Sequence, residues 1–163
     1  MQCKNLLFPL GVKFSEDRIF NIYAFGYANK VSYIKEAYYY RYINEKSAVH
    51  RFHEDYFEAY KKSAEEINKA IGSAWQNEDK FKVVYLQKFI NESLMAICNY
   101  YYKTSTLDNN SRIKAIEKVC SDSELQSAMQ RVDNDDFRIK LLQNKRIKLL
   151  IAYAKLANWK HKR

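Results

Sequence analysis

The stretch EDYFEAYKKSAEEINKAIG, residues 54–72, decides the fold, because its apolar side chains recur at the spacing of a helix. Six of them fall on one side of such a helix: Tyr56, Phe57, Tyr60, Ala64, Ile67 and Ile71. Gly72 follows, and glycine is the commonest residue just past a helix end. The stretch therefore predicts an amphipathic helix over residues 54–71 that buries one face.

The sequence beyond this helix predicts further helices. Residues 79–103 carry apolar side chains on several faces, so we expect that helix at the centre of a bundle. Two shorter helices are expected over residues 112–120 and 122–132. The second is opened by Ser121-Asp-Ser-Glu124, which matches a capping box.

A single last helix is expected over residues 135–160, and it carries the basic excess of the chain. The formal net charge is +9. Residues 137–163 contain nine Lys or Arg and no acid, and the other 19 basic residues balance all 19 acidic ones. Such a helix either lies on an anionic membrane surface or packs on the bundle with an exposed basic tail. An apolar seam favours packing: Leu142, Leu149, Tyr153 and Leu156.

The N-terminal third mixes helix and strand signals. Ser15 offers a cap for a helix over residues 16–29, with Glu16 and Asp17 in its first turn. Residues 31–34 and 38–42 are β-branched and aromatic runs, typical of two small strands. The expected fold is mainly α. A short α/β remnant with two strands over residues 1–53 is followed by a helical bundle over residues 54–163.

Cysteine usage and hydropathy bear on the compartment. Cys3, Cys98 and Cys120 are odd in number and widely spaced, so neither a disulfide framework nor a zinc knuckle is indicated. No stretch approaches the roughly 18 apolar residues of a membrane span. We expect a cytoplasmic protein, soluble or peripheral to the inner face of the membrane.

An ordered series of residues runs through this N-terminal third. It comprises Asn5-Leu6-Leu7, Val12-x-Phe14-x-Glu16-Asp17-x-x-Phe20-Asn21, Val31-x-Tyr33-Ile34, Tyr38-Tyr39-Tyr40-Arg41 and Ser47. In its order and spacing the series resembles the family 2 (GT-A type) glycosyltransferases. The resemblance implies that a turn bearing Glu16-Asp17 lies beneath the acceptor sugar, and that a Tyr-Arg strand with a following Ser closes the site.

The same resemblance implies an activity for a complete enzyme. It would transfer a sugar from a nucleotide-sugar donor to a glycan or lipid-linked acceptor with inversion, in surface polysaccharide synthesis. Such enzymes begin with a nucleotide-binding half and an Asp-x-Asp motif that holds a divalent metal, Mg²⁺ or Mn²⁺, and neither is present here. Asp133-Asn134-Asp135 has the letters but starts a helix, so capping explains it better. We therefore expect a C-terminal portion that has no cofactor or metal of its own and is inactive alone.

The chemistry explains why these residue types are wanted. Inverting transfer needs a carboxylate that takes the proton from the acceptor hydroxyl, and positive charge beside the departing diphosphate. Asp17 is the candidate base, and Glu16 is assigned to holding the acceptor or orienting a neighbouring group. Arg41 can meet phosphate oxygens bidentately, and Ser47 can add a hydrogen bond, so both are candidate substrate-binding residues.

Several of these residues have a second interpretation. Glu16 and Asp17 also suit the helix dipole, in which case they only stabilise the helix start. Arg41 can instead stack on an aromatic ring or lie at the surface. His50 and His53, three residues apart, could share a metal ion, although solvated histidines are the commoner case.

Another class of function stays open beside the transferase. The basic last helix, with the tyrosine runs 38–40 and 100–102 as stacking surfaces, would suit a helical module that binds nucleic acid or an anionic membrane. As part of an enzyme we expect sugar substrates and peripheral membrane contact through residues 137–163, and no nucleic acid. A purely structural helical partner is the third class.

Overall fold

The computed structural model describes residues 6–40, 52–75, 78–133 and 135–160, and these residues form seven helices and no strand. The expected mainly α fold is confirmed. The helices are α1 (Glu16–Tyr27), α2 (Tyr56–Ala74), α3 (Glu78–Asn99), α4 (Asn109–Ser121), α5 (Ser123–Arg131), α6 (Phe137–Gln143) and α7 (Ile147–Lys160).

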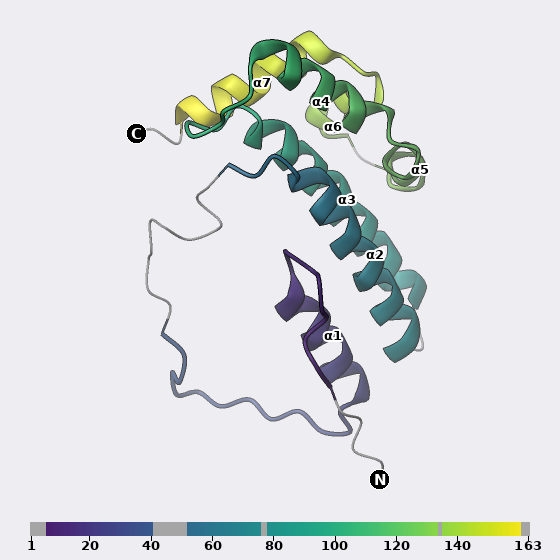
Figure 1. Cartoon of the computed structure of the whole chain (residues 1–163). Helices are drawn as coiled ribbons and strands as arrows, with labels where there is room; N and C mark the ends of the chain where they lie inside the picture. Colours follow the sequence, from purple (N-terminus) through teal and green to yellow (C-terminus); the bar gives the residue numbers. More distant parts are fainter. Residues whose placement is uncertain (1–5, 41–51, 76–77, 134, 161–163) are drawn as a thin grey trace.

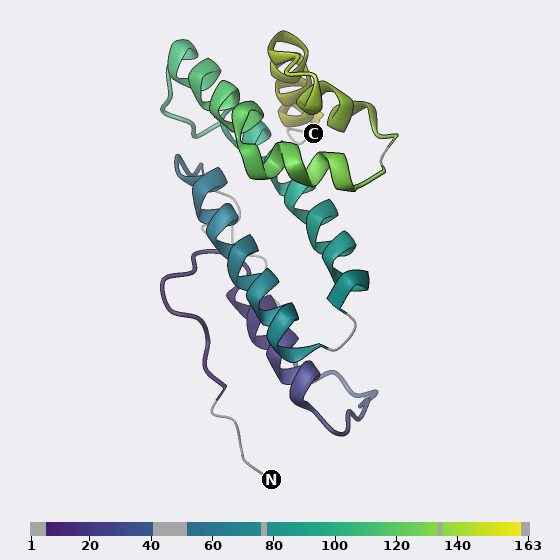
Figure 2. The same ribbon diagram turned by 90° about the vertical axis from the view of Figure 1, so that its right-hand side faces the viewer.

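Helices α2 and α3 form an antiparallel pair that runs the length of the molecule (Figures 1 and 2). Helix α1 packs on α2 at one end of this pair, and α4 to α7 gather around α3 at the other end. The pair therefore separates α1, which carries Glu16 and Asp17, from the basic helix α7.

Helix α2 matches the amphipathic pattern that predicted it. Its apolar stripe is buried, as Phe57, Tyr60, Ala64 and Ile67 show. The helix continues through Gly72 to Ala74, so Gly72 does not end it.

Aspartates begin three of the C-terminal helices. The Asp108 side chain accepts a hydrogen bond from Ser111 N, Asp122 from Leu125 N, and Asp136 from Arg138 N, at 2.9, 2.9 and 2.8 Å. These bonds satisfy backbone donors that a helix start leaves unpaired. The expected capping box at Ser121 is wrong, because its neighbour Asp122 is the cap.

The expectation of one helix over residues 135–160 is also wrong. The helix is interrupted between α6 and α7, where Lys145 adopts a left-handed backbone conformation with φ of 51°. The break changes which side of α7 meets the core. Leu150 and Ala154 are buried, whereas Leu149 and Leu156 of the predicted seam are exposed.

The two expected strands are not seen. Every residue from 28 to 40 is exposed and lacks regular structure, and this segment leaves α1 and runs away from the helices (Figure 1). Residues 31–34 fall within it, and the run 38–42 extends past the described residues. Strands are stable only when a neighbour satisfies their backbone groups, and the described helices offer no sheet edge.

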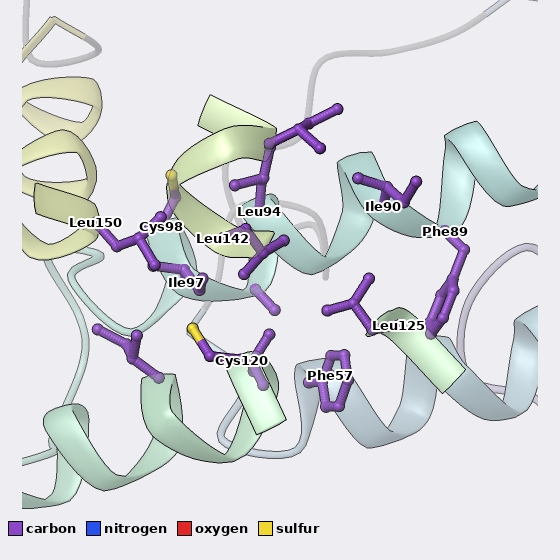
Figure 3. Close-up of a cluster of buried hydrophobic side chains, with 14 of the residues drawn as sticks. Phe57, Phe89, Ile90, Leu94, Ile97, Cys98, Cys120, Leu125, Leu142 and Leu150 are labelled. Carbon is purple, nitrogen blue, oxygen red and sulfur yellow. The ribbon is translucent and has the colours of Figure 1, made fainter. Parts of the chain in front are cut away.

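The described interior has two hydrophobic clusters. The larger is formed by side chains from all the helices from α2 through α7, and it includes Phe57, Ile97, Leu125, Leu142 and Leu150 (Figure 3). The smaller, which we call the α1 cluster, consists of Ile19, Ile67, Ala70 and Ile71.

Cys98 and Cys120 are free, buried thiols. Burial raises the pKa of each to about 11, which keeps them protonated and poorly nucleophilic.

Candidate functional site

The Glu16-Asp17 pair follows a sharp backbone turn. Ser15 adopts a left-handed conformation, with φ of 62°, and its carbonyl accepts the first helical hydrogen bond from Ile19 N at 3.1 Å. The Ser15 side chain makes no capping hydrogen bond, so the expected cap is wrong. Asp17 instead accepts a hydrogen bond from Arg18 N at 2.7 Å. Both carboxylates lie at the positive end of the α1 dipole, which favours negative charge there.

The residues before this turn are fixed to the start of α2. The Phe14 ring packs against the rings of His53 and Tyr56, with centroids 5.3 and 5.1 Å apart. Lys13 Nζ lies 2.6 Å from Asp55 Oδ1. That hydrogen bond is the main cause of the lowered pKa of Asp55. Residues 42 positions apart thus hold the turn in place.

The other end of α1 is held by a close helix crossing. A Cβ added to Gly26 would lie 2.5 Å from Ala74 Cβ and 2.7 Å from the Ala74 carbonyl oxygen, so only glycine allows this approach. Trp75 Nε1 also donates a hydrogen bond to Ile22 O at 3.1 Å. Both ends of the helix that bears Asp17 are therefore anchored to α2.

The structure separates the two carboxylates by their surroundings. Both are exposed, but only Asp17 lines a shallow surface hollow of about 370 Å³. The other lining residues come from α1 and the end of α2: Arg18, Asn21, Ile22, Phe25 and Trp75. A carboxylate at the edge of a hollow can meet the hydroxyl of a bound molecule, whereas Glu16 lies outside it.

An apolar cavity of about 320 Å³ lies beside this hollow and shares Arg18, Ile22 and Trp75 with it. Its walls come from α1, α2 and α3. Apolar lining includes Ala64, Ile67, Ile71, Phe81, Val84 and Phe89. Two cations, Arg18 and Lys88, also line it. The volume is at the small end of ligand pockets, roughly 300–1,000 Å³.

A polar network borders the cavity. Tyr56 donates its hydroxyl proton to Glu92 Oε2 at 2.9 Å, and Lys88 Nζ lies 2.5 Å from Glu92 Oε1. Arg18 Nη1 donates to the Tyr60 hydroxyl at 3.4 Å. Burial, together with Glu92, raises the pKa of Tyr60 to about 12 and that of Tyr56 further. Both phenols are therefore neutral donors near neutral pH.

The sequence did not identify Arg18, Tyr60, Lys88 or Glu92 as members of a site. One signal was present. Residues 79–103 are apolar on several faces, and one of those faces lines the cavity through Phe81 and Val84.

Other predicted site residues are placed as follows. Arg41, Ser47 and His50 lie outside the described residues. His53 is half-buried, its backbone pairs with the Asn99 side chain, and its ring meets Phe14. Within the described ranges, no three His, Cys, Asp or Glu side chains come together as a metal-binding group.

The structure also shows the surroundings of Asp135 and of the tyrosine run 100–102. Asp135 pairs with Lys140 at 2.9 Å just before α6, but the cap of that helix is the next residue, Asp136, so the expected capping role of Asp135 is wrong. Tyr100 is buried, and the Tyr101 ring is covered by Arg112 and Lys155 at 5.1 and 5.7 Å. Neither of these two rings is open for stacking with a base or a sugar.

Comparisons with known proteins returned no match to this chain among protein-family models, curated proteins or solved structures. Of the helices the structure describes, none is long and apolar enough to cross a membrane.

Proposed function

We propose that this chain is the acceptor side of an inverting family 2 glycosyltransferase that works together with a nucleotide-sugar-binding half. One observation carries the proposal: Asp17 lies at the edge of a surface hollow, on a helix start that a left-handed turn and two anchors hold in place. The ordered series around Glu16-Asp17 supports it. The acceptor is a glycan or a lipid-linked sugar in surface polysaccharide synthesis.

Each residue has a role in the proposed reaction. Asp17 takes the proton of the acceptor hydroxyl while that oxygen attacks the anomeric carbon of the donor, and the nucleoside diphosphate leaves from the opposite face. Glu16 holds the acceptor or orients its neighbour. Arg41 and Ser47 bind the diphosphate or the acceptor. A divalent metal, Mg²⁺ or Mn²⁺, that stabilises the leaving diphosphate is assigned to the other half of the enzyme.

The segment 28–40 fits the same proposal. Its exposed side chains are good strand formers, among them Val31, Tyr33 and Ile34. We propose that residues 31–34 and 38–42 become strands when the donor-binding half supplies a sheet edge.

The test compares two polypeptides in one transfer assay. One is the 163-residue chain, and the other includes the residues encoded immediately upstream. A radiolabelled sugar is offered from a panel of UDP- and GDP-sugars to oligosaccharide and lipid acceptors. We expect transfer only by the longer polypeptide. A longer polypeptide that binds no nucleotide sugar by calorimetry would contradict the proposal.

A second candidate function is binding to an anionic membrane surface through α7. Leu149, Leu156 and Trp159 are exposed on one side of this helix, at successive spacings of seven and three residues, and Lys148 and Lys155 flank them. Apolar residues beside basic ones suit the interface of an anionic bilayer. Helix α7 packs with the other C-terminal helices around α3, away from α1, so this surface is separate from the hollow (Figure 1).

Vesicle sedimentation tests this surface. We expect the chain to bind phosphatidylglycerol vesicles, to bind less as salt rises, and to prefer them over phosphatidylcholine. The double variant Leu149→Ser/Leu156→Ser should lose about tenfold or more in affinity, because each exposed leucine removed costs apolar burial. The matched control Leu7→Ser/Leu10→Ser changes two leucines that are also exposed, far from α7. Equal losses in both variants would refute a specific α7 surface.

A further inference from the structure

The cavity between α1, α2 and α3 has an apolar end and a charged end. Its α2 wall runs from Tyr60 to Ile71, three turns or about 16 Å of helix. At the Ile71 end, the rings of Trp75 and Phe81 meet with centroids 4.8 Å apart. At the Tyr60 end lie Arg18 and Lys88. The cavity is therefore long, and its two ends differ in polarity.

The mouth of the cavity is also apolar. Val84 lines it and is 67% exposed, on the solvent side of α3. Lys88 follows one turn later on the same side of that helix, so an apolar entrance and a cation are neighbours. A monomeric protein rarely exposes apolar walls of this kind without a use for them.

The charges near the mouth favour an anion at Arg18. Lys88 is paired with Glu92, which neutralises most of its charge. The Arg18 guanidinium makes no ion pair with any described residue, and it donates a long hydrogen bond to the neutral Tyr60 hydroxyl. Asp17 lines the neighbouring hollow and not this cavity. The guanidinium is thus the cation that remains for a ligand.

We infer that this cavity binds a single hydrocarbon chain that ends in an anionic phosphate or carboxylate head. The hydrocarbon lies along α2 with its tip against Trp75 and Phe81, and the anionic head meets Arg18 near Tyr60. A guanidinium binds either kind of head through paired hydrogen bonds. The inference does not rest on the proposed sugar transfer, because all the residues that line the cavity belong to this protein.

Trp75 provides the signal that tests this site. The chain has two tryptophans, so Trp159→Phe leaves Trp75 as the only one. In that variant we expect dodecyl phosphate, added below its micelle concentration, to change the Trp75 emission in a saturable manner. Dodecanol should bind more weakly, and dodecyltrimethylammonium should bind weakest because its head repels Arg18.

Matched variants locate the site. Val84→Asp, made in the Trp159→Phe chain, should weaken dodecyl phosphate binding about tenfold or more, because it places a carboxylate in the apolar mouth. Val83→Asp is the control, since Val83 is 53% exposed on the same helix and does not line the cavity. Arg18→Gln should weaken dodecyl phosphate about tenfold while leaving dodecanol binding unchanged.

Three results would overturn the inference: no saturable change at Trp75, equal losses in the Val84 and Val83 variants, or binding of dodecyltrimethylammonium as tight as that of dodecyl phosphate. Dodecanoate and farnesyl phosphate distinguish an acyl chain from an isoprenoid one, and tight binding of either supports the site. The two proposals can fail separately. If the 163-residue protein binds these probes, but the Asp17→Asn variant of the longer polypeptide transfers sugar normally, the cavity site stands and Asp17 is refuted as the catalytic base.

Discussion

If this chain is the acceptor side of a glycosyltransferase, as proposed, replacing Asp17 by Asn is expected to lower kcat for sugar transfer by the longer polypeptide roughly 10²- to 10⁴-fold. The amide keeps the size of the side chain, and its oxygen can still accept the hydrogen bond from Arg18 N, so α1 should start as before. What is lost is the carboxylate that is proposed to take the acceptor proton. Steady-state kinetics should show the loss in kcat, with KM for the donor little changed.

Glu16→Gln is the matched control for that variant. Glu16 is the preceding residue, is also exposed and lies in the same helical turn, but it does not line the hollow. We expect it to raise KM for the acceptor and to lower kcat much less. Unchanged transfer by Asp17→Asn, or equal losses in the two variants, would show that the pair only stabilises the helix start.

Leu142→Ala is expected to lower the free energy of unfolding by about 2–5 kcal/mol. Leu142 is 0% exposed, and in Figure 3 it lies among side chains from α3 and α7, including Leu94, Ile97 and Leu150. Truncation removes apolar contacts and leaves a cavity that three helices would have to move to fill. Urea denaturation should show a lower midpoint with little change in slope.

The same change at Leu149 tests whether burial is the cause. Leu149 lies on α7 and is 51% exposed, so Leu149→Ala should cost well under half as much. Equal losses at the two positions would mean that α6 is not docked as described.

Local patterns predicted most of the helices. Five of them match the expected ranges to within four residues at each end, because their apolar stripes lie within the segment itself. The capping aspartates Asp108 and Asp122 explain the shifts at the starts of α4 and α5. Asp108 starts α4 three residues before the expected position.

The failures arise where tertiary context decides. No residue between 135 and 160 is a strong helix breaker, so nothing in the sequence marked the left-handed turn at Lys145. Residues 31–34 have the composition of a strand, but a strand needs a partner that composition cannot supply.

The candidate site was predicted in part. The residues around Asp17 in the sequence pointed to it as a candidate, and in the structure Asp17 lines a surface hollow. The cavity beside it is formed by residues from three helices, such as Ile22, Ile71 and Val84, whose meeting no local pattern encodes. Glu92 was likewise missed, since its role depends on Tyr56 and on Lys88 one turn away.

The division of the interior into two clusters has a consequence for cooperativity. Helix α1 packs mainly on one helix, α2, through the four-residue α1 cluster, whereas α3 shares the large cluster with five other helices. The helix that carries Asp17 therefore belongs to a unit that can open locally at a lower free energy than global unfolding. A molecule bound between α1 and α3 would bind only the closed form. By mass action it would hold Asp17 in place while the rest of the protein stayed unchanged.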